Sequence, residues 1–172
     1  MKEKGNEHFR NKEYEEAKEA YTEAIFAAET SEGEPDNELN AILYANRAAC
    51  NMLLEDPEQC LADADHALSL KTPYPKVRTR KFWALRKQGK ANDAMAELKK
   101  AFEEDPSLEQ TYDKEYKEIQ KEAEAETEKL KTEALGQLKE LGNKFLGLFG
   151  MSTDNFHLQQ NPDGGYNVQF KQ

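Results

Sequence analysis

The sequence predicts an all-α protein: an α-solenoid of three repeated helix pairs, closed by a long C-terminal capping helix. Three observations support this fold class. Segments of the chain resemble one another at a spacing of 34 residues, apolar residues recur at helical spacing, and charged residues make up 34% of a chain with only six prolines. After the long helix, the sequence favours a short amphipathic segment and a terminal β-hairpin.

The internal repeat is clearest when Asn46 is placed over Arg80. Small or apolar residues then coincide at four further positions, Ala48 with Phe82, Cys60 with Ala94, Ala64 with Leu98, and Ala67 with Ala101. The first segment aligns with the second at a spacing of 43 residues, which is 34 plus an insertion of nine. Units of this length stack into a solenoid because one helix pair cannot bury its apolar surface alone.

The repeat pattern divides residues 1–106 into three units. The repeats cover about 1–31, 41–74 and 75–108, and an acidic insert covers about 32–40. The predicted helix pairs are 1–12 with 14–29, 37–54 with 57–70, and 75–88 with 91–104. Asp56 before Pro57 is a typical helix start, an N-cap followed by proline at the first helical position. Tyr74 before Pro75 separates the second repeat from the third.

Residues 107–133 are predicted to cap the solenoid and then to project from it. Leu108, Tyr112, Tyr116, Ile119 and Ala123 recur at helical spacing, and a terminal repeat needs such a cover. The stretch 122–133 is mostly charged, which indicates a solvated helix.

Residues 134–172 are predicted to form a tail of one amphipathic helix and a β-hairpin. Two alternating runs flank the turn sequence 161–165, and one register pairs Phe156 with Phe170, Leu158 with Val168, and Gln160 with Tyr166. In this register the apolar residues share one face. Because a two-stranded hairpin is marginal in water, we expect it to lie on another surface.

Composition excludes several classes of function. A formal net charge of −10 argues against a nucleic-acid partner. No apolar run approaches the roughly 18 residues of a membrane span, and the polar start of the chain holds no secretion-signal core. Cys50 and Cys60 lack metal or redox spacing, so a cytoplasmic location is the simplest expectation.

No catalytic or metal-binding constellation is visible. The three histidines are scattered without ligand spacing, and no glycine-rich phosphate loop is present. Asp63 and Asp65 lie on different faces of their predicted helix. We therefore expect no enzyme activity, no metal and no cofactor.

A basic stretch is the main chemical signal. Residues 71–90 carry no acidic side chain but eight basic ones: Lys71, Lys76, Arg78, Arg80, Lys81, Arg86, Lys87 and Lys90. Lys76 and Arg80 lie one turn apart, where like charges repel by a few tenths of a kcal/mol. An uncompensated basic face in an acidic protein indicates an anionic ligand.

The repeat length, its small residues and the ending Ala101-Phe102-Glu103-Glu104-Asp105-Pro106 resemble the tetratricopeptide repeat (TPR) family. Within it, the chain is similar to the carboxylate-clamp class, which holds the C-terminal Glu-Glu-Val-Asp peptides of heat-shock protein 70 and heat-shock protein 90. The clamp pattern of that class falls on Lys2, Asn6, Asn46, Lys76 and Arg80.

These residue types suit a peptide that ends in aspartate. Asn6 and Asn46 can donate amide hydrogens to the terminal carboxylate. Lys2 and Lys76 supply positive charge, and the guanidinium of Arg80 can form a bidentate hydrogen bond with a carboxylate. We expect Phe9, one turn after Asn6, to be an apolar floor for the peptide.

The tail carries a second resemblance. Residues 135–156 are similar to the C-terminal region of the family formed by tetratricopeptide repeat protein one and its eukaryotic relatives, which implies a cytosolic adaptor or co-chaperone. The tail either folds back onto the repeats or docks a client or second partner. The candidate contact residues are Leu141, Phe145, Leu146, Leu148, Phe149, Phe156, Tyr166 and Phe170.

The sequence thus predicts a non-catalytic co-chaperone that links a chaperone's C-terminal peptide to a partner of its tail. Two alternatives remain open. One is a scaffold whose groove binds another acidic peptide without any chaperone. The other is a small-GTPase or signalling adaptor that acts through the tail.

Overall fold

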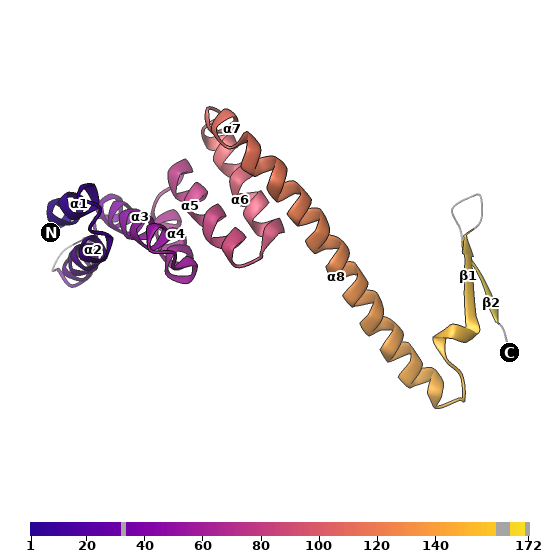
Figure 1. Ribbon diagram of the computed structural model, residues 1–172. Coiled ribbons are helices and arrows are strands. Elements are labelled where there is room, and N and C mark those ends of the chain that lie inside the picture. The colour runs from indigo at the N-terminus through magenta and orange to yellow at the C-terminus, as the bar shows by residue number, and fades with distance from the viewer. Residues whose placement is uncertain (32–33, 161–165, 171–172) are drawn as a thin grey trace. The chain divides into compact units, whose positions relative to one another are not determined.

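In the computed structural model, the described residues 1–31, 34–160 and 166–170 begin with three consecutive helix pairs (Figure 1). The pairs are α1 (Lys2–Arg10) with α2 (Tyr14–Glu29), α3 (Asn37–Leu53) with α4 (Pro57–Leu70), and α5 (Pro75–Lys87) with α6 (Ala91–Glu104). Each helix packs against the next, and α3 also packs against α5. This is the predicted α-solenoid. Part of the predicted acidic insert, residues 32–33, lies outside the described residues.

Local sequence sets where the helices begin and turn. Asp36 and Asp56 each accept a hydrogen bond from a backbone N–H of the first helical turn, at 2.9 and 3.0 Å, as N-caps do. The turn inside each pair contains one residue with positive φ, namely Lys12, Glu55 and Gly89. These three residues occupy equivalent positions of the repeat, so the turn recurs together with the helices.

Small residues allow the helices to approach one another. Ala17, Ala45, Cys60, Ala64 and Ala94 are fully buried at the contacts between helices. Both cysteines are buried free thiols, and burial raises the pKa of each to about 12. They act as small apolar residues of the core.

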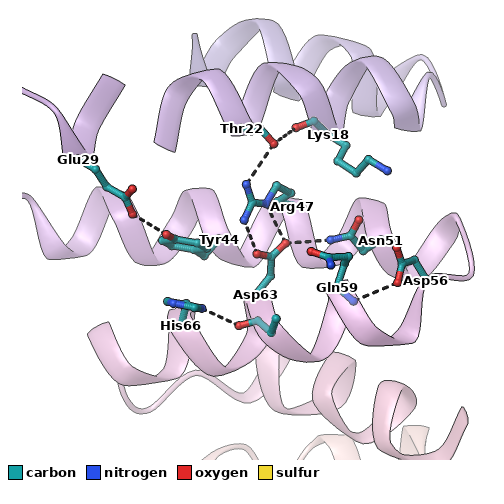
Figure 2. A network of polar contacts seen from close by, with 11 residues as sticks. Lys18, Thr22, Glu29, Tyr44, Arg47, Asn51, Asp56, Gln59, Asp63 and His66 are labelled. Atoms are coloured by element: carbon teal, nitrogen blue, oxygen red, sulfur yellow. Dashed lines mark hydrogen bonds and ion pairs between the residues drawn. The ribbon is translucent and has the colours of Figure 1, made fainter. Parts of the chain in front are cut away.

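A buried polar network connects the two helices of the second repeat (Figure 2). Asp63 of α4 is 2% exposed and receives hydrogen bonds from Nε and Nη2 of Arg47, at 2.9 and 2.6 Å, and from Nδ2 of Asn51, at 2.9 Å. Arg47 also donates to Thr22 of α2 at 3.1 Å. The network therefore joins α2, α3 and α4 through one carboxylate, whose charge is compensated by a guanidinium.

The chain divides into two compact units, Met1–Glu126 and Thr127–Gln172. In the first unit, a short helix α7 (Leu108–Thr111) leads into α8 (Asp113–Gly147). Ile119 and Ala123 of α8 are buried in one apolar cluster with Phe82 and Leu98, and Arg86 of α5 pairs with Glu118 and Glu122 at 2.9 and 2.6 Å. Thus α8 covers the last repeat.

Helix α8 differs in extent from the predicted segments. It begins after a break at Tyr112 and continues through residue 133, where the sequence pattern places a boundary between a charged helix and an amphipathic one. Gly136 and Gly142 do not interrupt it, since a glycine costs a helix only about 1 kcal/mol. The amphipathic segment is the C-terminal part of α8.

The second unit contains the end of α8, a 3-10 turn η1 (Thr153–Asn155) and the strands β1 (Phe156–Gln160) and β2 (Tyr166–Phe170). The strands pair antiparallel with Phe156 opposite Phe170, the register that the sequence pattern favours. The predicted loop 161–165 lies outside the described residues, as do the side chains of Tyr166 and Phe170. Among the described residues, no helix is both long enough and apolar enough to cross a bilayer.

The turn between α8 and β1 folds back on the helix. The N–H of Thr153 donates to Oδ1 of Asn143 at 2.5 Å, and Lys139 pairs with Asp154 at 2.6 Å. Leu146 is half-buried. Other apolar side chains of this part of α8 and of the turn that follows it are 64–79% exposed: Leu135, Leu138, Leu141, Phe145, Leu148 and Phe149.

Candidate peptide-binding groove

The predicted clamp residues all lie on the first helix of their repeat. Lys2 and Asn6 are on α1, Asn46 is on α3, and Lys76 and Arg80 are on α5. These first helices share one side of the solenoid, because α3 packs against α5 and Nδ2 of Asn46 on α3 donates to Oδ1 of Asn6 on α1 at 3.3 Å. The spacing of four residues within α1 and within α5 places both members of each pair on one helix face.

Four predicted residues meet at one cavity of about 310 Å³, which we call the small cavity. Asn6, Phe9, Asn46 and Arg80 line it. Its other lining residues are Glu3, Arg10, Tyr21 and Ala49. The structure therefore brings together both predicted amide donors, the predicted guanidinium and the predicted apolar floor.

A hydrogen-bond network fixes the orientation of the Asn6 amide. The hydroxyl of Tyr21 donates to Oδ1 of Asn6 at 2.8 Å, and Nδ2 of Asn46 donates to the same oxygen at 3.3 Å. The Nδ2 group of Asn6 is then left to donate outward, and it reaches Glu3 at 3.5 Å. Burial raises the pKa of Tyr21 to about 12, so its hydroxyl remains a donor at neutral pH.

The position of Tyr21 depends on Gly5. A Cβ atom at Gly5 would lie 2.6 Å from a ring carbon of Tyr21, closer than any real contact. Only glycine therefore lets α1 approach the ring whose hydroxyl orients Asn6. Tyr21 was missed as a site residue because it is on α2 and its repeat position is occupied elsewhere by core residues.

Arg80 is the electrostatic centre of the groove. Its guanidinium donates to the backbone carbonyl of Ala45 at 2.7 Å, and burial lowers its pKa. Among the described residues, no carboxylate pairs with it. A desolvated cation without a counter-charge is unfavourable, so an anionic ligand at this position would stabilise the folded protein.

Lys76 and Lys2 lie outside the small cavity. Lys76 is exposed and lines a neighbouring cavity of about 740 Å³, the large cavity, which it shares with Arg80. Lys2 lines neither cavity, and its Nζ atom lies 3.9 Å from Glu3. Hence Lys76 adjoins the site through Arg80, whereas Lys2 is only a neighbour of Asn6 along α1.

The large cavity has an apolar lining from three elements. Met52 of α3, Phe82 and Trp83 of α5, and Tyr112 before α8 contribute its apolar surface. The remaining lining residues are Lys76, Thr79, Arg80, Arg86, Lys87, Glu115 and Glu122. The sequence pattern places Tyr112 only in the segment that caps the last repeat, because the cavity depends on how α8 packs beside α5.

Most of the basic stretch is neutralised within the protein, contrary to the expectation that it is uncompensated. Its ion pairs are Lys71 with Glu38, Arg78 with Glu97 and Glu104, Lys81 with Asp65 and Glu97, Arg86 with Glu118 and Glu122, and Lys87 with Glu55. The acids come from other helices and, for Glu55, from the turn between α3 and α4, which the local sequence does not reveal. Among the described residues, Lys76, Arg80 and Lys90 have no ion pair, and the first two line the groove.

Comparison with solved structures decides the family. The second TPR domain of Spaghetti (RPAP3), bound to the HSP90 peptide SRMEEVD, is 30% identical, with a TM-score of 0.53 over 60% of this chain and 88% of that chain. The chain belongs to the tetratricopeptide repeat proteins. The second TPR domain of human RPAP3, in complex with the HSP70 peptide SGPTIEEVD, is 29% identical, with a TM-score of 0.59 over 69% of this TPR chain and 91% of that chain.

A curated relative agrees with this assignment. The small glutamine-rich tetratricopeptide repeat-containing protein 2 of Saccharomyces cerevisiae is 37% identical over 103 residues, which are 60% of this TPR chain. The chain spans 27% of the length of that relative. No protein-family model matches the chain. The likeness of residues 135–156 to the family of tetratricopeptide repeat protein one stays a prediction.

Proposed function

We propose that this TPR protein is a non-catalytic co-chaperone adaptor, whose groove binds the C-terminal Glu-Glu-Val-Asp peptide of heat-shock protein 70 or heat-shock protein 90. One observation carries the proposal: Asn6, Asn46 and Arg80 surround a single cavity, and Arg80 is desolvated without a carboxylate partner among the described residues. The peptide's terminal carboxylate would supply the missing negative charge.

Each groove residue has a role in this proposal. Asn6 and Asn46 donate N–H groups to the terminal carboxylate, Arg80 provides a charged fork, and Lys76 attracts the acidic side chains upstream. Lys2 contributes charge beside Asn6. Charge-assisted hydrogen bonds contribute about 1.5–3 kcal/mol each, so several of them support micromolar binding after the cost of ordering the peptide.

The comparisons support the ligand class. Two similar TPR domains, at 29% and 30% identity, are bound to peptides that end in Glu-Glu-Val-Asp. This chain has amide and guanidinium donors at a cavity of its own, which makes the same chemistry available to it. We place the adaptor in the cytosol, where its two free thiols would remain reduced.

A second contact is proposed for the tail. Leu138, Leu141 and Phe145 are exposed on the C-terminal part of α8, and Phe149 is exposed in the turn that follows it. Exposed apolar residues grouped in this way are typical of an interaction surface. We assign it to a client or second partner, whose identity is open.

Calorimetric titration with SRMEEVD tests the groove. We expect Arg80→Ala to weaken binding at least about tenfold, because a charge-assisted bond is lost, and Lys76→Ala to weaken it less. Lys90→Ala is the matched control, since Lys90 also lacks an ion pair among the described residues but lies outside both cavities. Asn46→Asp, which keeps the side-chain shape, should repel the peptide. Unchanged binding by Arg80→Ala and Asn46→Asp would contradict the proposal.

A further inference from the structure

Glu115 is a carboxylate of α8 that lines the large cavity. Of the two acids that line the large cavity, Glu122 pairs with Arg86 at 2.6 Å. Glu115 is half-buried and makes no ion pair within the described part of the chain. A partly desolvated carboxylate is best satisfied by a cation.

The cations that line the same cavity are engaged elsewhere. Arg86 is held by Glu118 and Glu122, at 2.9 and 2.6 Å. Lys87 lies 3.7 Å from Glu55 and 5.8 Å from the ring centre of Trp83. Lys76 and Arg80 are assigned to the carboxylates of the peptide. None of these cations forms an ion pair with Glu115 in the described part of the chain, which leaves its charge available to a cation of the ligand.

The arrangement of the two cavities orients the peptide. Its terminal carboxylate belongs in the small cavity with Asn6 and Asn46, and Arg80 lines both cavities. The chain upstream of the terminus consequently passes Arg80 and enters the large cavity. An extended peptide advances about 3.3–3.6 Å per residue, and this path directs the residues before the acidic run toward the large cavity.

The lining of the large cavity matches an apolar residue followed by a basic one. Met52, Phe82, Trp83 and Tyr112 offer apolar surface for one side chain. Successive side chains of an extended peptide point to opposite sides, so the next residue upstream points away from that surface and can reach the rim. Glu115 lines the same cavity and is half-buried, and it offers that residue a negative charge.

We propose that Glu115 is a specificity residue, which selects acidic C-terminal peptides that carry a basic residue immediately before the apolar residue preceding the acidic run. This inference rests on the proposed function. Of the two peptides bound by the similar TPR domains, SRMEEVD has arginine at this position and SGPTIEEVD has threonine. The groove would therefore favour the HSP90-type sequence.

Calorimetry with SRMEEVD and with SAMEEVD, which lacks only the arginine, tests the proposal. We expect the wild-type chain to prefer SRMEEVD about three- to fivefold, as a partly exposed ion pair allows, and to lose this preference at high salt. Glu115→Gln should bring the affinities for the two peptides to equality, whatever common change the loss of a negative charge causes in the binding of both acidic peptides, and Glu115→Lys should reverse the preference. Glu124→Gln, an exposed neutralisation on the same helix outside the cavity, should retain it.

The outcomes separate the two proposals. Equal affinities of the wild-type chain for the two peptides, or a preference that survives Glu115→Gln, would overturn the role of Glu115 and leave the carboxylate-binding groove standing. Binding of neither peptide would overturn both proposals.

Discussion

Glu3 places a carboxylate where a carboxylate ligand is expected. It lines the small cavity and accepts a hydrogen bond from Nδ2 of Asn6 at 3.5 Å. A bound peptide terminus would need the same donor and would be repelled by the Glu3 charge. The free groove is thus partly occupied by one of its own side chains.

Glu3→Gln should therefore strengthen peptide binding by about two- to fivefold, because it removes a like charge near the terminal carboxylate. Titration of SRMEEVD into both chains measures the effect. Glu7→Gln, an exposed neutralisation one turn further along α1 and outside the cavity, should leave the affinity unchanged. Weaker binding by Glu3→Gln would show that Glu3 orients Asn6 usefully instead of competing with the ligand.

At the residue scale, the sequence predicted those site residues that lie on the first helix of each repeat. The spacing of Asn6, Asn46 and Arg80 follows from the repeat, and the structure places all three at one cavity. Tyr21 and Glu115 could not be predicted because they come from α2 and α8, and their positions depend on how these helices pack. The partners of Arg78 and Arg86 were missed for the same reason.

At the scale of elements, the turn between the two helices of a pair recurs from repeat to repeat, as the helices do. Glu55 and Gly89 occupy equivalent positions, with φ of 56° and 74°. The left-handed region is unfavourable by about 1 kcal/mol for a residue with a Cβ atom, and only the third repeat places glycine there.

Glu55→Gly should accordingly stabilise the protein by about 0.5–1 kcal/mol, after the smaller entropic disadvantage of glycine in the unfolded chain. The loss of its 3.7 Å contact with the exposed Lys87 matters little. The free energy of unfolding in urea measures this effect. Glu58→Gly, inside the first turn of α4, should destabilise the protein. If Glu55→Gly also destabilised the protein, this would contradict the inference that the backbone of Glu55 is strained.

An ion-pair cluster between α5 and α6 makes stability depend on pH. Burial raises the pKa of Glu97, but the hydrogen bond from Lys100, the charge of Lys81 and the hydrogen bond from Arg78 outweigh it, so the pKa is lowered overall. A carboxyl group with a lowered folded-state pKa stabilises the protein above its unfolded pKa, about 4.3 for glutamate. This contribution is lost as the pH falls through the folded-state value.

Glu97→Gln should therefore destabilise the protein at pH 7 by about 2–4 kcal/mol, because it leaves Arg78 and Lys81 without their shared carboxylate. The difference from the wild-type chain should shrink as the pH falls below about 4.3. Urea unfolding at several pH values measures it. Glu103→Gln, at an exposed position of α6, should show no such trend, and a constant difference for Glu97→Gln would refute the linkage.

At the scale of whole elements, the sequence indicated most helices but not the extent of α8. The six repeat helices agree with their predicted ranges to within about two residues, since proline, N-cap residues and the repeat itself mark their ends. No such signal exists at residue 133, where the change from charged to apolar side chains alters the surface of the helix without ending its hydrogen bonds.

The whole molecule consists of two compact units, and all the groove residues belong to the first one. The 34-residue repeat was sufficient to predict the solenoid, because each helix pair contacts mainly its neighbours. The sequence pattern also favoured the strand register of the second unit, since alternating apolar residues fix strand pairing.

A chain that ends at residue 126 should retain the groove, because Ile119 and Ala123 still cover the last repeat. We expect it to unfold cooperatively and to bind SRMEEVD within about twofold of the full chain's affinity. A tenfold loss of affinity with a folded chain would show that the second unit takes part in peptide binding.

The measurement that tests the central claim most directly is calorimetry with SRMEEVD and with the same peptide amidated at its C-terminus. If Asn6, Asn46 and Arg80 hold a terminal carboxylate, the free acid binds, its affinity falls with added salt, and the amide binds at least about tenfold more weakly. Equal binding of the two peptides would contradict the account.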